Sequence, residues 1–68
     1  MSTQEPITFL RLKDVCQRTG LSGTHIYRME AKGRFPKRVH LSEATTVWVE
    51  TEVQQWCAER IAASRVAA

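Results

Sequence analysis

The chain has 68 residues, of which 43% are hydrophobic and 25% are charged, and its formal net charge at pH 7 is +3. A chain of this length buries only about 60% of the surface that its unfolded form exposes, so it has room for one small core and not for a large, deep active-site cleft. The composition disfavours intrinsic disorder, and with no long apolar run and no basic-then-apolar N-terminus it predicts a cytoplasmic protein without a membrane span or signal peptide.

Positive charge is concentrated in one part of the sequence. Residues 11–40 have a net charge of +6, whereas residues 41–68 have a net charge of −2. A concentrated positive charge is typical of proteins that bind polyanions, because neutralised phosphates release their condensed counterions. Surface lysine and arginine also keep small proteins in solution, so the charge alone does not decide between these two interpretations.

The N-terminal part of the sequence predicts an arm followed by a short helix. Residues 1–8 contain a proline and no periodic pattern, and we expect them to form a flexible arm. Residues 9–10 then supply apolar anchors. Residues 13–18 predict a helix of about two turns with Val15 facing inward, and Gly20 is placed to end it in a left-handed conformation.

A second helix is predicted over residues 23–32. Ser22 is a good N-cap, because its hydroxyl can accept a hydrogen bond from a free amide of the first turn, and Gly33 is placed to end the helix. Two segments this short are stable only when they pack together. Two helices joined by a short turn that contains glycine are typical of a helix-turn-helix motif.

A two-stranded hairpin follows the second helix in the prediction. Residues 37–41 alternate, with Val39 and Leu41 on one face, and residues 45–49 are rich in β-branched side chains. Residues 42–44 make the turn. A hairpin directly after a helix-turn-helix motif is typical of a wing.

The sequence ends in a third predicted helix. Thr51 and Gln54 match a capping box, and the helix is expected to run to about residue 64, with a tail over residues 65–68 that frays. One face of this helix is marked by Val53, Trp56, Cys57, Arg60 and Ile61. We therefore predict a mainly α fold with a small β-hairpin, in the order α-α-β-β-α, which is a winged helix-turn-helix domain over residues 9–64.

The outward face of the second helix is the candidate functional surface. If Ile26 faces the core, the helical period directs Thr24 and Arg28 away from it. Arg28 is then suited to pair with guanine O6 and N7 in a major groove, and Thr24 to contact a base edge or a thymine methyl group. Tyr27 is expected to contact phosphate. The alternative is an ordinary solvated helix face.

These residues resemble the AlpA family of prophage regulators, which are small winged-helix proteins related more distantly to the MerR DNA-binding domain and to phage excisionases. The resemblance covers about residues 9–62 and is carried by FLRLKDVCQRTGLSGTHIYRMEAKGRFPKRVHL and by VWVETEVQQWCAERIA. It implies a protein that binds double-stranded DNA as a transcriptional regulator or as a recombination directionality factor. It also implies that the second helix enters the major groove and that the hairpin lies near the backbone or the minor groove.

The resemblance assigns DNA-binding roles to particular positions of this chain. The recognition positions are Ser22, Thr24, His25, Tyr27 and Arg28, and the wing positions are Lys37, Arg38 and His40. Lys32 on the second helix and Arg34 on the flank of the wing add positive charge, so they are also candidate DNA contacts of the recognition helix and of the wing, respectively. The sequence departs from the family at Glu30, where an apolar residue is common. Because Glu30 lies near the buried side of the helix, it must reach solvent or find a cationic partner.

The remaining conspicuous side chains predict core positions. Trp48 and Trp56 are expected to face inward, and Phe35 to fix the wing to the core. The cysteines at residues 16 and 57 are expected to be buried thiols.

No catalytic or metal-binding pattern is evident. Cys16, His25, His40 and Cys57 are separated by 8, 14 and 16 residues, which matches no usual zinc site, and no histidine has a nucleophile at a typical spacing. We expect no enzyme, no cofactor and no small-molecule substrate.

The expected partner is double-stranded DNA, together with an integrase or with further copies of the chain on repeated sites. Two alternatives remain open: an interaction module of the same fold that binds an acidic protein, and a small metalloenzyme that would purify with stoichiometric zinc.

Overall fold

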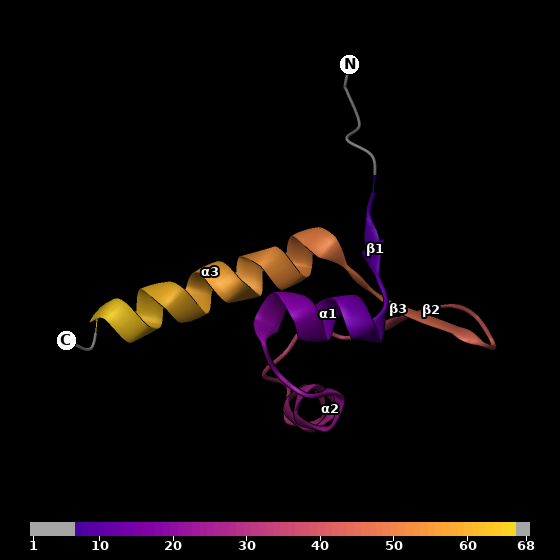
Figure 1. Cartoon of the computed structure of the whole chain (residues 1–68), viewed down its shortest axis with the longest axis horizontal. Helices are drawn as coiled ribbons and strands as arrows, with labels where there is room; N and C mark the ends of the chain where they lie inside the picture. Colours follow the sequence, from indigo (N-terminus) through magenta and orange to yellow (C-terminus); the bar gives the residue numbers. More distant parts are fainter. Residues whose placement is uncertain (1–6, 67–68) are drawn as a thin grey trace, which may run out of the picture.

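The structure is a computed structural model and describes residues 7–66 of the chain. Its elements are β1 (Phe9–Leu10), α1 (Leu12–Thr19), α2 (Gly23–Ala31), β2 (Val39–Ser42), β3 (Thr45–Val49) and α3 (Glu50–Val66). The predicted winged helix-turn-helix fold and its α-α-β-β-α order are confirmed (Figure 1). Residues 1–6 of the expected arm and residues 67–68 of the expected tail lie outside the described residues.

The sheet has a third strand that the sequence analysis did not predict. Strand β1 pairs antiparallel with β3, with Phe9 opposite Val49 and Leu10 opposite Trp48, so the strand order is β1-β3-β2. The carbonyl of Thr8 also accepts a hydrogen bond from the backbone N–H at the start of α3, at 2.9 Å. Two residues are too few to show the alternation by which a strand is predicted, so only the pairing identifies β1.

The hairpin of β2 and β3 contains an irregularity near its tip. Val39 lies opposite Val47 and His40 opposite Thr46, but the register shifts before the next pair, so Leu41 is bulged. Leu41 is 51% exposed whereas Val39 is partly buried, so the predicted alternation that places both on one face stops at the bulge. A bulge adds one residue to a strand and removes it from the alternation that the sequence pattern suggests.

The helix-turn-helix motif is held by the predicted caps. Gly20 ends α1 at φ 77°, and its N–H donates to the carbonyl of Cys16 at 2.8 Å. Ser22 is the N-cap of α2, and its hydroxyl oxygen accepts from the N–H of His25 at 3.2 Å. Gly33 follows α2 at φ 72°, a conformation in which a side chain is strained. These contacts leave a turn of only three residues between the helices, as the motif requires.

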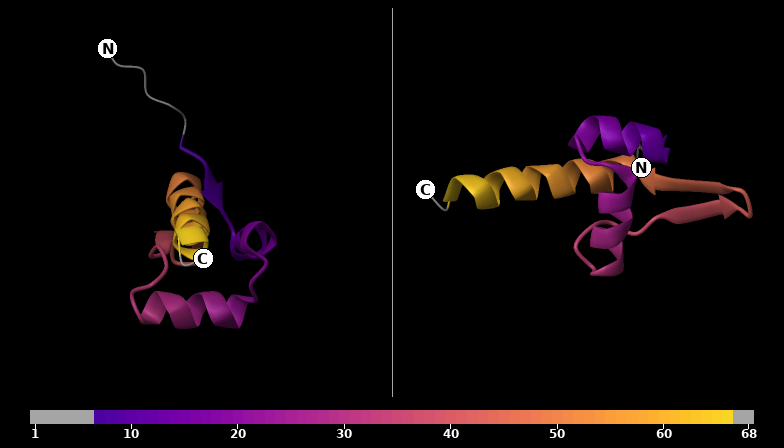
Figure 2. Two further views of the ribbon diagram at one scale, coloured as in Figure 1. Left: turned by 90° about the vertical axis from the view of Figure 1, so that its left-hand side faces the viewer. Right: turned by 60° about the horizontal axis from the view of Figure 1, so that its bottom comes forward.

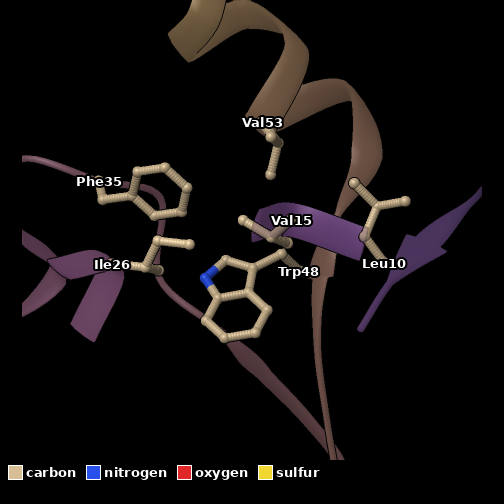
Figure 3. Close-up of a cluster of buried hydrophobic side chains, with 6 residues drawn as sticks. All are labelled: Leu10, Val15, Ile26, Phe35, Trp48 and Val53. Atoms are coloured by element: carbon tan, nitrogen blue, oxygen red, sulfur yellow. The ribbon is translucent and has the colours of Figure 1, made fainter. Parts of the chain in front are cut away.

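The core lies where the helices meet the sheet (Figure 3). Its cluster draws one side chain from each of β1, α1, α2, the loop after α2, β3 and α3: Leu10, Val15, Ile26, Phe35, Trp48 and Val53. The predicted buried positions of Phe35 and Trp48 are confirmed. Trp56 and the two free cysteines pack against this cluster but are only partly buried, so the expectation that the thiols are buried is wrong in degree.

Helix α3 begins directly after β3, and the hairpin and α3 extend from the core in opposite directions (Figures 1 and 2). Thr51 lies inside this helix and not at its N-cap, so the predicted capping box is wrong. Glu50, the first helical residue, forms an ion pair with Arg18 of α1 at 2.8 Å. Val53 is buried as predicted, but Ile61 is 51% exposed, because the helix has left the core before it reaches that turn. Among the residues described, none of the helices has both the length and the apolar character needed to cross a bilayer.

Candidate nucleic-acid interface

Helix α2 presents one buried side and one exposed side. Ile26 is fully buried, and its position confirms the orientation that the helical period predicts. The exposed side chains of the helix and its C-cap are Thr24, His25, Tyr27, Arg28, Ala31 and Lys32. Thr24 and Arg28 are one helical turn apart, so both can face the same ligand. Neither side chain forms a hydrogen bond or an ion pair with another of the residues that the structure describes.

Ser22 has a structural role besides any contact with a ligand. Its oxygen caps α2 by accepting from the N–H of His25. A serine hydroxyl carries both a donor and an acceptor, so the proton of Ser22 is still free to be donated. The side chain is exposed at the N-terminus of α2, where the helix dipole favours negative charge.

A small cleft lies between α2 and the wing. It has a volume of about 400 Å³, and its lining residues are Tyr27, Glu30, Ala31, Lys37, Arg38 and His40. The structure therefore brings one predicted recognition residue together with three predicted wing residues. The others on α2, which are Ser22, Thr24, His25, Arg28 and Lys32, lie outside the cleft lining.

Three of the residues that line this cleft form one contact network. The carboxylate of Glu30 accepts a hydrogen bond from the backbone N–H of Arg38 at 2.6 Å, and its other oxygen lies 3.6 Å from the Arg38 guanidinium. That guanidinium lies over the ring of Tyr27, 5.1 Å from the ring centroid. The requirement that Glu30 finds a cationic partner is thus met by Arg38. The sequence analysis predicted from the position of Glu30 that it needs solvent or a cationic partner, but it did not identify Arg38 as that partner.

Two tryptophan residues hold the segment between α2 and the wing. The indole N–H of Trp48 donates to the carbonyl of Pro36 at 3.1 Å, and that of Trp56 donates to the carbonyl of Arg34 at 2.7 Å. The ring of Phe35 packs edge-on against Trp56, with 4.8 Å between the centroids. Sequence reasoning assigned both tryptophans to the core and missed these bonds. A buried indole N–H generally finds an acceptor, which was the available signal.

The basic residues that follow α2, up to and including those on β2, lie in different surroundings. Arg34 is not part of the cleft between α2 and the wing. It lines a groove of about 1060 Å³ that lies between the segment after α2 and α3, and Lys37 and Arg38 line this groove as well. His40 lies on the exposed side of β2, where its Nδ1 is 3.2 Å from the hydroxyl of Thr46. Within residues 7–66, Lys32, Arg34 and Lys37 have no carboxylate partner in an ion pair. Their charges are therefore available to a polyanion.

The side chains that could bind a metal ion do not cluster. In the part of the chain that the structure describes, no three His, Cys, Asp or Glu side chains come close enough together to hold a metal. The candidate site thus consists of hydrogen-bonding and cationic groups on a helix, a loop and a hairpin. Such a surface is suited to an extended anionic ligand.

Comparisons with known proteins agree with this description. The family described as Prophage CP4-57 regulatory protein (AlpA) matches residues 8–61. The chain is 43% identical over 60 residues to the uncharacterized protein ORF88 of Enterobacteria phage P4, an alignment that covers 88% of this chain and 66% of that protein. It is 31% identical over 68 residues to the DNA-binding transcriptional activator AlpA of Escherichia coli (strain K12), with 88% of this chain and 94% of that protein covered. No solved structure matches the chain. The chain belongs to the AlpA family of prophage regulatory proteins.

Proposed function

We propose that this protein is a phage-type transcriptional regulator that binds double-stranded DNA in a sequence-specific manner, with α2 as its recognition helix. The observation that carries the proposal is the exposed pair of Thr24 and Arg28 on α2, flanked by cations that have no ion-pair partner among the described residues. A helix of this kind fits the major groove, which admits an α-helix and displays a distinct pattern for each base pair. The relative from Escherichia coli is itself named a DNA-binding transcriptional activator.

The proposed contacts divide into base recognition and phosphate binding. Arg28 is placed to donate two hydrogen bonds to guanine O6 and N7, and Thr24 to contact a neighbouring base edge or a thymine methyl group. Phosphate contacts come from the rest of the candidate surface, which consists of Ser22, His25, Tyr27, Lys32, Arg34, Lys37, Arg38 and His40. Contacts of the second kind orient the protein on the duplex and carry no sequence information.

The proposal leaves three uses for such binding: activation of transcription, repression, and bending of DNA for an integrase, as an excisionase does. A single module of this size covers only about 600 to 1,000 Å² of its own surface on DNA, so cooperative binding of further copies to repeated sites follows naturally. We propose that the protein acts in the cytoplasm, and we propose no catalytic step for the chain.

The test is a selection of bound duplexes from a random library, followed by titrations of the selected duplex at several salt concentrations. Phosphate contacts from Lys32, Arg34, Lys37 and Arg38 give an expected slope of log affinity against log salt of about −3.6. An enriched sequence with a slope of this size supports the proposal. No enrichment, together with tight binding to an acidic protein, would instead favour the interaction module.

A further inference from the structure

The proposed DNA surface contains one acidic side chain that charge alone does not explain. Glu30 lines the cleft between α2 and the wing, among residues that are otherwise neutral or basic. A carboxylate facing phosphates should weaken DNA binding by repulsion. Yet the Glu30 side chain is only 10% exposed, and both of its oxygens are directed at Arg38.

We propose that Glu30 is a positioning residue of the DNA-binding surface, which fixes Arg38 and the start of the wing relative to the recognition helix. Arg38 directly precedes β2, so whatever holds its backbone also determines the direction in which the wing leaves α2. This inference rests on the proposed function, and it concerns the arrangement of the DNA-binding surface and not the identity of the bases.

The hydrogen bond from the backbone N–H of Arg38 to Glu30 contributes most to this positioning. A hydrogen bond of 2.6 Å from the N–H of Arg38 to a carboxylate oxygen is charge-assisted, and such bonds are roughly twice as strong as neutral ones. Because the donor belongs to the main chain, the bond restrains the path of the chain whatever side chain stands at position 38. The bond joins residues eight positions apart, one in the last turn of α2 and the other directly before β2.

The side chain of Arg38 is held by the same group. Its guanidinium contacts both Glu30 and the ring of Tyr27, and the centroid of that ring lies 6.0 Å from the centroid of the fully buried indole of Trp48. The network thus connects the wing to the core through the recognition helix. Arg38 remains 42% exposed, and a guanidinium has five N–H donors, so some stay free for a phosphate oxygen.

The positioning role and simple charge repulsion predict opposite changes in DNA affinity when Glu30 is replaced. If Glu30 were only an acidic neighbour of the phosphates, its replacement by glutamine would strengthen DNA binding. If it positions the wing, its removal weakens binding. Glu43 offers a matched control, because it is an exposed carboxylate in the turn of the wing, and its side chain forms no hydrogen bond or ion pair within residues 7–66.

The experiment compares Glu30→Ala, Glu30→Gln and Glu43→Gln with the wild-type chain on a duplex selected by the wild type and on a scrambled duplex of equal length. We expect Glu30→Ala to weaken binding to the selected duplex roughly tenfold, since it removes a hydrogen bond to a charged group. Glu30→Gln keeps an oxygen that can accept from the N–H of Arg38, so its loss is smaller. Glu43→Gln is expected to bind as tightly as the wild type or more tightly.

The amide resonance of Arg38 in free protein gives a readout that does not depend on DNA. We expect its proton signal to lie downfield in the wild type, to move upfield in Glu30→Ala, and to move less in Glu30→Gln. Thermal melts accompany these spectra. If Glu30→Ala does not fold, the isosteric Glu30→Gln carries the test, with a weaker affinity and a shifted Arg38 amide as the expected result.

Two outcomes separate the failure of this inference from that of the proposed function. A wild-type chain that binds the selected duplex while both Glu30 variants bind as tightly or more tightly, like the Glu43 control, overturns the positioning role alone. A wild-type chain that binds no duplex overturns the proposed function, and the positioning role falls with it.

Discussion

Replacing Trp48 by alanine tests whether the fold is organised around this indole. Trp48 is fully buried, lies opposite Leu10 in the sheet, and donates its N–H to the carbonyl of Pro36. The centroid of its ring also lies 6.0 Å from that of the Tyr27 ring on α2. One substitution therefore removes core volume and a hydrogen bond, and it also removes a support of the candidate DNA surface.

The size of the effect follows from burial. Truncation of a buried tryptophan costs about 3 to 5 kcal/mol of unfolding free energy. A domain of this length has a total unfolding free energy of roughly 3 to 10 kcal/mol, so Trp48→Ala should remove a large part of it. Trp48→Phe keeps an aromatic ring and loses the N–H, and it should cost about 1 to 2 kcal/mol for the missing bond. Trp56→Ala should cost less than Trp48→Ala, at about 1.5 to 3 kcal/mol, because Trp56 is only partly buried.

The assay is unfolding in urea followed by far-ultraviolet circular dichroism, which reports on the helices and does not depend on the tryptophan that was replaced. The free energy is obtained from the midpoint and the slope of each transition. If the unfolding free energy of Trp48→Ala lies within about 1 kcal/mol of the wild-type value, the reasoning is refuted, because truncation in a filled core costs more than that. So would a larger loss in Trp56→Ala than in Trp48→Ala.

Two further substitutions separate structural from binding roles. Ser22→Ala should cost about 1 kcal/mol through the lost N-cap, and it should lower the melting temperature by roughly 4 to 8 °C. A Ser22→Ala protein with a normal melt and lost DNA affinity would make the hydroxyl a DNA contact and not a cap. Lys37→Ala should weaken binding equally on specific and random duplexes and lower the salt slope by about one, as measured by titrations at several salt concentrations. A loss of affinity confined to one DNA sequence, with an unchanged salt slope, would assign Lys37 to base recognition.

The parts of the fold that depend on local signals could be predicted from the sequence. Gly20, Ser22 and Gly33 act within one turn of the chain, so their residue types were sufficient to place the ends of the two short helices. The β-branched run at residues 45–49 likewise predicted β3 with its observed bounds. Each of these features is decided by residues that are neighbours in the sequence.

The features that were missed depend on residues distant in the sequence. Strand β1 exists through its pairing with β3, and the bulge at Leu41 is a property of the ladder and not of its own strand. The exposure of Ile61 depends on where the core ends, because the helical pattern continues after the helix has left it. A period in the sequence shows which residues share a face, but not whether anything packs against that face.

The candidate site shows the same division. The exposure of Thr24 and Arg28 followed from the helical period once Ile26 was placed inward. The contacts of Arg38 with Glu30 and Tyr27 could not be predicted, because they require the path of the loop that brings the wing back to α2. Sequence reasoning therefore predicted that these side chains of α2 are exposed, but it did not predict the contacts that hold Arg38.

The most direct test of the central claim is the base preference of an Arg28→Ala protein. Titrations of the wild type and the variant against every single-base substitution of the selected duplex would accompany a thermal melt of each. Arg65→Ala, which removes an exposed arginine from α3, is the matched control for the change in charge. We expect Arg28→Ala to fold normally, to lose about 1 to 3 kcal/mol on the selected duplex, and to lose its preference at one base pair. An Arg28→Ala protein that melts normally and keeps the wild-type preference at every position would contradict the assignment of α2 as the recognition helix.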